Sequence, residues 1–128
     1  MAYNRHSSRG FTIIELMVVL ACIGLLLSIA APRFLQHIDH AREVTLRQDL
    51  QQVRVAIDQF QADQSRYPVG LDELVSHHYL RSVPVDPITN RTDTWKLDQA
   101  PGQASGTISD VHSGAPGQAQ DGSAYASW

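Results

Sequence analysis

The chain has 128 residues, of which 43% are hydrophobic and 18% are charged, and its formal net charge is −3. This length is typical of one globular domain, and a single cysteine excludes an internal disulfide framework and a four-cysteine metal site. Ten Lys and Arg stand against 13 Asp and Glu without a long basic run, which excludes the electrostatic surface typical of nucleic-acid-binding proteins.

The first feature in chain order is an apolar stretch behind a short basic leader. Residues 1–10 carry Arg5 and Arg9 and no acid, and 17 of the 21 residues in 11–31 are apolar. A helix of that length spans roughly 30 Å, which is the hydrocarbon thickness of a bilayer. Arginines before the span and none inside it predict a cytoplasmic N-terminus. The sequence therefore predicts a single-pass membrane helix.

Three interpretations of this stretch need no special function. A secretory signal peptide cleaved after residue 30 would release a soluble periplasmic module, but the apolar stretch is longer than usual and contains Glu15. A lipoprotein signal would use the string VLAC that ends at Cys22, but more apolar residues follow that cysteine. A plain anchor helix would make Glu15 part of a T-x-x-E capping box that begins at Thr12.

A fourth interpretation accounts for all of these features together. The string RGFTIIELMVVLACIGLLLSIAAPRF, residues 9–34, resembles the type IV prepilin signal. The resemblance implies that a prepilin peptidase cleaves between Gly10 and Phe11, methylates the amine of Phe11 and leaves residues 11–31 as anchor and filament core. It also implies that Glu15 pairs with the amine of Phe11 in a neighbouring subunit. Such a pair would neutralise a buried charge and fix the register between subunits.

Pro32 ends the apolar stretch and predicts a kink in the helix. The helical period continues to residue 64, so we expect one helix of about 50 residues, with residues 32–64 as the periplasmic half of a spine. Its apolar positions, which are expected to pack on a C-terminal domain, are Phe34, Ile38, Ala41, Leu46, Leu50, Val53, Ile57 and Phe60. The charged face, including Glu43, Arg47 and Arg54, is expected to be solvated or in subunit contacts. Glu43 and Arg47 have the spacing of an i,i+4 ion pair.

Residues 65–128 are expected to form a small head. The string SRYP ends the long helix, residues 71–79 are expected to form a short helix, and residues 80–87 an extended segment. Residues 94–98 and 107–112 alternate enough to predict two short antiparallel strands, joined by a PGQASG loop. The glycine-rich remainder is predicted to be turn and coil, held down by Tyr125 and Trp128.

Residues 1 to about 90 resemble the major pseudopilins of type II secretion. The residues that carry the resemblance beyond the signal are Arg66-Tyr67-Pro68, Leu71, Leu74, Tyr79-Leu80, Val83-Pro84 and Asp86-Pro87. The sequence departs from that family at residues 88–92, where ITNRT replaces the usual Trp-Gly-Asn-Pro-Tyr. The resemblance implies an α+β pilin-like fold, in which a helical spine packs on a small head. It also implies a structural role in a pseudopilus that supports secretion across the outer membrane.

The same resemblance implies the partners and the location. The partners would be a prepilin peptidase and methyltransferase, other copies of the chain, minor pseudopilins and an inner-membrane assembly platform. The chain would cross the bacterial inner membrane once, with its head in the periplasm, and no catalytic arrangement of residues points to an enzyme. The alternative is a type IV pilus subunit, major or minor, in adhesion, motility or DNA uptake. A membrane-anchored enzyme is a further alternative, which no plausible site supports.

The family resemblance also implies a calcium loop near the C-terminus. The oxygen donors available there are Asp110 and Asp121, with Ser113 and Ser123. Calcium takes six to eight oxygen ligands, and two carboxylates are few, so we expect a solvated polar loop and no cofactor. The histidine pairs at positions 37 and 40 and at 77 and 78 are expected to be surface residues.

Overall fold

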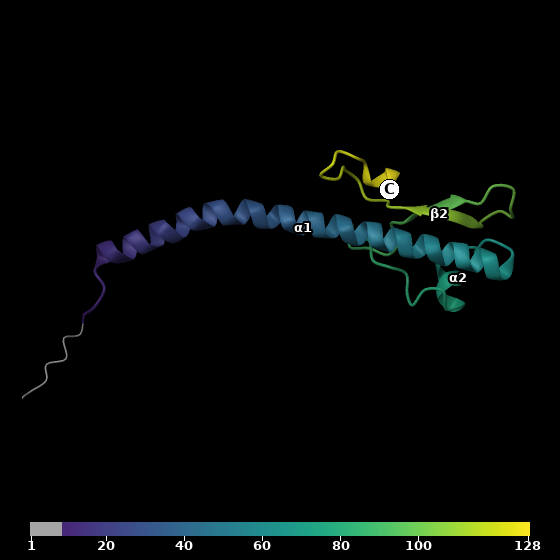
Figure 1. The fold of residues 1–128 in the computed structure, drawn as a ribbon, viewed down its shortest axis with the longest axis horizontal. Coiled ribbons are helices and arrows are strands. Elements are labelled where there is room, and N and C mark those ends of the chain that lie inside the picture. Colours follow the sequence, from purple (N-terminus) through teal and green to yellow (C-terminus); the bar gives the residue numbers. More distant parts are fainter. Residues whose placement is uncertain (1–8) are drawn as a thin grey trace, which may run out of the picture. The chain divides into compact units, whose positions relative to one another are not determined.

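The computed structural model describes residues 9–128, and Figure 1 shows its elements in chain order. A long helix α1 (Ile13–Gln64) is followed by a short helix α2 (Leu71–Ser76), two strands, β1 (Lys96–Gln99) and β2 (Ile108–His112), and a 3-10 turn η1 (Tyr125–Ser127). These elements are those of the predicted α+β pilin-like fold. The chain forms two compact units that divide between His37 and Ile38. Arg5, which contributes to the predicted orientation, lies outside the described residues.

Helix α1 begins at a side-chain cap and runs without interruption. The main-chain N–H of Glu15 donates to Oγ1 of Thr12 at 3.2 Å, which is one half of the predicted capping box. The helix has 52 residues and continues through Pro32, so the predicted long helix is confirmed, while a kink at Pro32 stays a prediction. It ends before Ser65, whose positive φ of 53° turns the chain out of the helix.

The second unit, Ile38–Trp128, contains the core. Five residues of the predicted stripe on α1 are at most 1% exposed: Leu46, Leu50, Val53, Ile57 and Phe60. Leu71 and Leu74 of α2 and Ile108 and Val111 of β2 belong to the same cluster. Burying a side chain of this size contributes about 1.5–3 kcal/mol. The stripe therefore fastens α2 and the sheet to the C-terminal part of α1.

The predicted stripe does not extend upstream as expected. The first buried residue of α1 is Glu43, Phe34 is 66% exposed, and Ala41 is also exposed. In the second unit, Ile38 is half-buried and full burial on α1 begins at Glu43. The prediction that Ala41 packs on the head is therefore wrong, while that for Phe34, which lies in the first unit, stays a prediction.

Helix α2 is shorter than predicted because a tight turn stops it at Ser76. His78 has a positive φ of 64°, and the N–H groups of His78 and Tyr79 donate to the carbonyls of Val75 (3.1 Å) and Leu74 (2.8 Å). These two bonds form a Schellman motif, in which a residue in the left-handed conformation closes the helix. Here a histidine takes the position that glycine usually fills, so no glycine marks the end of the helix in the sequence.

The two strands pair antiparallel, as predicted, in a two-stranded sheet. Lys96 pairs with His112 and Asp98 pairs with Asp110, and an irregularity follows between Asp98 and Gln99. The loop between the strands turns at Gly102 and Gly106, which both have positive φ. The register therefore places two carboxylates directly opposite each other across the sheet.

A buried carboxylate joins the extended segment before β1 to the chain after β2. Asp86 is fully buried and accepts hydrogen bonds from the N–H of Ile88 (2.8 Å) and from Oγ of Ser113 (2.7 Å). The Ser113 hydroxyl in turn accepts the N–H of Ala115 at 3.1 Å. This network satisfies the Asp86 carboxylate, so burial of the charge is compensated.

Candidate processing and assembly segment

Gly10 and Phe11 form an accessible segment directly before α1. Both residues are exposed, and the Phe11 side chain is 86% exposed. A Cβ added at Gly10 would meet no atom within 4 Å. Packing within the described chain therefore gives no reason for a glycine at this position. A glycine, which has no side chain, allows another molecule to approach the main chain closely.

Glu15 lies in the first turn of α1, four residues after Phe11. Its main-chain N–H is held by the Thr12 cap, and an acid in the first turn interacts favourably with the positive end of the helix dipole. The side chain is exposed. The carboxylate is thus displayed close in sequence to the amine that cleavage before Phe11 would create.

The surface of α1 that follows Glu15 is apolar and exposed. Among the described residues, α1 is the one helix long and apolar enough to cross a membrane, with a window of mean hydropathy 2.7 and none of it buried. Leu16 and Ile29 are 56% and 58% exposed. The hydroxyl of Ser28 donates to the carbonyl of Leu25 at 2.6 Å, so this polar group is satisfied within the helix. Such a surface needs lipid or other apolar helices around it.

In the second unit, three charged residues of α1 hold the C-terminal segment, which the sequence did not predict. Glu43 is 8% exposed and accepts the N–H of Gln120 (2.8 Å) and the hydroxyl of Tyr125 (3.2 Å). Arg54 donates to Asp110 (2.8 Å) and to the main-chain oxygens of Val111 (2.9 Å) and Trp128 (2.8 Å).

Arg47 completes this set, and its contacts correct the predicted ion pair with Glu43. Its guanidinium is 3.2 Å from the carboxylate of Asp121 and stacks 4.1 Å from the ring centre of Trp128. Tyr125 and Trp128 hold the C-terminal segment in place, as predicted, and their ring centroids lie 5.4 Å apart. Positions 43, 47 and 54 are 4 and 7 residues apart, which places them along one helix face. This spacing was the one sign in the sequence that the three residues act together.

Burial and the adjacent Glu43 carboxylate raise the pKa of the Tyr125 phenol above its ordinary value. The Asp110 carboxyl behaves in the opposite way. Burial raises its pKa, but the hydrogen bonds from Arg54 and from the N–H of Val111 lower it by more, so its pKa lies below the ordinary value. Both residues therefore take part in structural contacts between the tail or β2 and α1.

The structure does not assemble the donors considered for calcium. Asp110 binds Arg54 and Asp121 binds Arg47, while Ser113 is buried and donates to Asp86. Within residues 9–128, the one group of three neighbouring acidic or histidine ligand atoms contains Asp110 but not Asp121. The described structure does not bring these donors together, and the expected absence of a cofactor stays a prediction.

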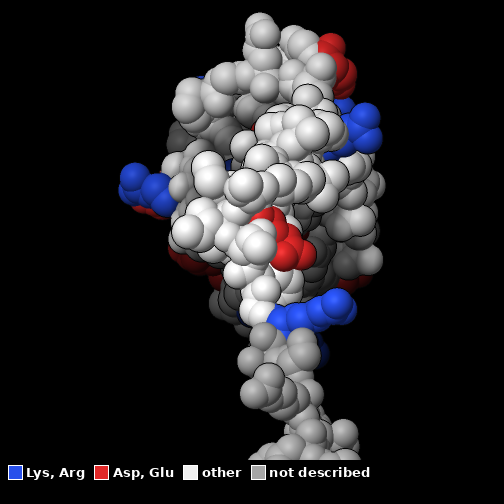
Figure 2. Space-filling model, turned by 90° about the vertical axis from the view of Figure 1, so that its left-hand side faces the viewer, with Lys and Arg blue, Asp and Glu red and all other residues white. Residues whose placement is uncertain are grey.

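The charged side chains do not gather on the face drawn in Figure 2, where separate basic and acidic groups stand among uncharged atoms. Uncharged surface dominates this face. An assembly contact there would depend on shape and apolar or neutral polar groups more than on a field of one sign.

Comparison with known proteins identifies two kinds of similarity. The family described as "Prokaryotic N-terminal methylation motif" matches residues 5–31. Over a longer range, the chain is 32% identical to the type II secretion system core protein G of Klebsiella michiganensis, across 100 residues that cover 66% of this chain and 70% of the relative. It is 30% identical to the Pseudomonas aeruginosa core protein G, covering 68% of this chain and 72% of the relative.

A shorter match links the chain to pili. The type IV major pilin protein PilA of Myxococcus xanthus is 37% identical over 67 residues, which cover 52% of this chain and 30% of that protein. No solved structure gives a significant match. The alignments to core protein G cover more of the chain than α1 alone can supply, so they include part of the head.

Proposed function

The chain belongs to the type II secretion system core protein G family, and on this premise we propose that it is a structural subunit of a type II secretion pseudopilus. The observation that carries the proposal is the combination of an N-terminal methylation motif over residues 5–31 with an exposed apolar helix directly behind it. The role proposed here is assembly, in support of protein transfer across the outer membrane.

Processing is proposed to occur between Gly10 and Phe11. The exposed peptide bond, and the absence of any neighbour within 4 Å of a Cβ at Gly10, support this position. A prepilin peptidase would cut after Gly10 and methylate the new amine of Phe11. The new N-terminus would then lie one turn before the Glu15 carboxylate.

The apolar helix and the basic leader support a proposed location. We propose that residues 11–31 cross the inner membrane once, with the leader in the cytoplasm and the head in the periplasm. The span has the required length and hydropathy, and Arg9 precedes it. Before assembly, lipid would cover the apolar side chains, and in the filament the same helices of other subunits would replace the lipid.

Assembly is proposed to depend on Glu15. When helices pack together away from water, an unpaired carboxylate is costly and requires a partner. The methylated amine of Phe11 in a neighbouring subunit is the proposed partner, because it carries a positive charge. The pairing would also set the axial register. Further partners would be minor pseudopilins and the inner-membrane assembly platform.

The mature N-terminus tests the proposal. Intact mass and N-terminal peptide sequencing of the protein purified from native membranes should give a chain that starts with N-methylated Phe11. A chain that starts at Ala31, at a lipidated Cys22 or at Met1 would contradict prepilin processing and with it the filament role.

A second measurement separates the two filament systems. The match to PilA covers only 30% of that protein, whereas the core protein G relatives align beyond the spine, so secretion is the expected system. Deletion of the gene should abolish release of secreted enzymes and leave surface pili unchanged. Loss of surface pili with normal release would assign the chain to a type IV pilus.

A further inference from the structure

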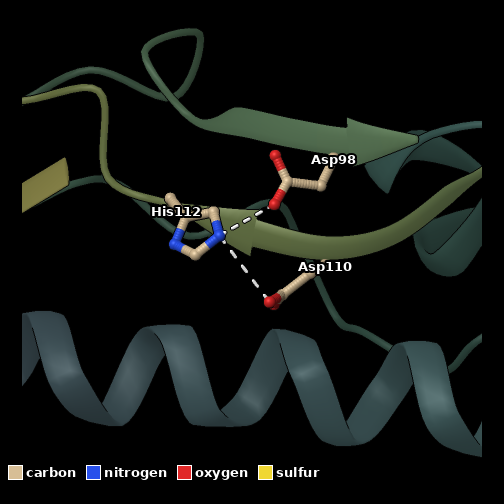
Figure 3. A group of neighbouring side chains, drawn as sticks. All are labelled: Asp98, Asp110 and His112. Atoms are coloured by element: carbon tan, nitrogen blue, oxygen red, sulfur yellow. Dashed lines mark hydrogen bonds and ion pairs between the residues drawn. The ribbon is translucent and has the colours of Figure 1, made fainter. Parts of the chain in front are cut away.

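Three side chains meet on one face of the two-stranded sheet. Figure 3 shows Asp98 from β1 and Asp110 and His112 from β2, with the imidazole between the two carboxylates. His112 Nε2 lies 2.9 Å from Oδ2 of Asp98 and 3.6 Å from Oδ2 of Asp110. One ligand atom from each residue falls within 4.8 Å of the others.

The strand register places like charges together at this point. Asp98 and Asp110 are direct cross-strand partners, an arrangement in which two carboxylates repel each other and destabilise the sheet. His112 follows Asp110 by two residues, so it projects from the same face of β2. A positive charge between the two carboxylates would reverse the sign of this interaction.

The histidine ring is held so that both of its nitrogens face oxygen acceptors. Nδ1 contacts the main-chain oxygen of Trp128, and Nε2 faces Asp98. A neutral imidazole can donate through one nitrogen only. If Nδ1 donates to Trp128, the Nε2 lone pair of the neutral ring points toward two carboxylates. That arrangement is satisfied by a cation at Nε2, either a proton or a metal ion.

We propose that Asp98, Asp110 and His112 form a binding site for a divalent transition-metal ion of the zinc type. One imidazole nitrogen and two carboxylate oxygens are ligands that zinc accepts, and a histidine ligand with few oxygens does not suit calcium. A tetrahedral zinc ion with bonds of about 2.0–2.2 Å spaces its ligands roughly 3.4 Å apart. The observed separations of 2.9 and 3.6 Å bracket that value. A water molecule would complete the four ligands.

The surrounding contacts are those of a supported metal site. Metal-binding histidines usually donate their second nitrogen to a main-chain oxygen or a carboxylate, and the Nδ1 contact with Trp128 supplies this. Arg54 and the N–H of Val111 both donate to Oδ1 of Asp110, each at 2.8 Å. These bonds orient the carboxylate and leave its Oδ2 facing His112. Arg54 therefore positions the ligand Asp110 through Oδ1 and does not occupy the place of the ion.

The bound ion would connect three segments of the head. It would join β1 to β2 across the repulsive pair and, through His112, fix the main chain at Trp128. The same Trp128 is held by Arg54 and stacked under Arg47. The metal is therefore expected to stabilise the sheet edge and the tail together, and it is not needed for membrane insertion or processing.

Titration of the purified full-length protein with Zn²⁺ in detergent tests this proposal. After treatment with EDTA, isothermal titration calorimetry should show one saturable site, and thermal unfolding followed by tryptophan fluorescence should shift to higher temperature with Zn²⁺. X-ray absorption of the loaded protein should show a first shell of nitrogen and oxygen that includes one imidazole. Both tryptophans, Trp95 and Trp128, lie in the head, so their fluorescence reports on the region of the site.

The decisive variant is Asp98→Asn, because Asp98 is on the exposed strand and its removal relieves the repulsion. The variant should keep the fold. Loss of a residue that only hydrogen-bonds to a metal ligand lowers metal affinity about 10–100-fold, and loss of the ligand Asp98 should weaken Zn²⁺ binding by more than that. His112→Gln should abolish the imidazole signal. The double variant His37→Gln/His40→Gln removes the other histidine pair considered in the sequence and should bind as the wild type does.

Two results would overturn the proposal. One is the absence of saturable Zn²⁺ binding by the wild-type protein, in which case the contacts among the three side chains are structural only. The other is binding that persists in Asp98→Asn but disappears in the His37→Gln/His40→Gln variant, which would place the ion on α1.

Discussion

Gly114 connects two parts of the head that are distant in sequence. A Cβ at this position would lie 1.8 Å from the main-chain oxygen of Thr94, which is far closer than any non-bonded contact. The chain after β2 therefore passes against the segment before β1 with no room for a side chain. Ser113, the preceding residue, donates to the buried Asp86 carboxylate in the same region. These two residues fix the crossing of the two segments.

Gly114→Ala is expected to destabilise the head. Overpacking of this kind costs about 1–3 kcal/mol, and here the obstacle is main chain, which cannot rotate away. Gly70→Ala is the matched control, because its Cβ would meet nothing within 4 Å and its φ of −179° is extended backbone. Urea unfolding followed by tryptophan fluorescence should show a lower midpoint for Gly114→Ala alone. Equal midpoints for the two variants would contradict the close approach.

At the scale of an element, helix α2 is defined by interactions at both ends. Glu73 accepts the N–H of Val69 at 2.6 Å and binds the guanidinium of Arg66 through both of its oxygens, at 2.5 and 3.2 Å. The donor Val69 precedes the N-cap residue Gly70, so this contact holds the turn that leads into the helix. His78 closes the other end. The six-residue helix thus depends on its caps more than on its length.

These contacts predict a pH dependence of the stability of the head. The hydrogen bonds from Arg66 hold the pKa of the Glu73 carboxyl below its ordinary value of 4.5. The unfolded chain therefore binds this proton more readily than the folded chain. The stabilisation is fully present above pH 4.5 and is lost as the pH falls through the lowered pKa of the folded state.

Glu73→Gln removes this ionisation, so the urea midpoint of the variant should fall less between pH 5 and pH 3 than that of the wild type. At pH 7 the variant should be the less stable protein, because the charged hydrogen bonds are lost. Asp72→Asn, an exposed change in the same turn, should keep the wild-type slope. Parallel slopes for the wild type and Glu73→Gln would contradict the assignment.

At the scale of the whole molecule, the two units differ in whether their apolar side chains are buried. The second unit buries its own apolar stripe, with Leu46 and Phe60 fully inside. The first unit keeps large apolar side chains exposed along its helix, such as Leu26 at 67% and Ile13 at 80%. The first unit therefore exposes an apolar surface that needs lipid or other apolar helices around it. Glu15 is the acid at the start of that surface.

Glu15→Leu should leave membrane insertion intact, because it replaces a carboxylate by an apolar side chain and lengthens the apolar stretch. Pseudopilus assembly should fail or fall markedly, since the amine of Phe11 would lose its partner. Ser28→Ala is a control in the same span, because the Ser28 hydroxyl is already satisfied by Leu25. Membrane fractionation measures insertion, and sheared-filament yield measures assembly. A normal filament yield from Glu15→Leu would contradict the proposed pairing of Glu15 with the amine of Phe11.

The sequence alone determined the long helix, its apolar first half, the buried stripe from Leu46 to Phe60, and the strand pair. These features follow from periodicity and composition, which are local and repeat along the chain. The processing site at Gly10 and Phe11 was also predicted from a contiguous motif, and the match over residues 5–31 agrees with that motif.

Tertiary structure alone decided the environment of individual polar residues. Glu43 and Arg54 belong to a face that the sequence assigned to solvent or to subunit contacts, yet within the chain they bind residues 74 or more positions away, including Trp128 and Gln120. The meeting of Asp98, Asp110 and His112 likewise depends on the strand register. Periodicity identifies the faces of a helix or strand, but it carries no information about which distant segment returns to cover them. That choice is made by packing, because a buried charge is tolerated only where a specific partner arrives.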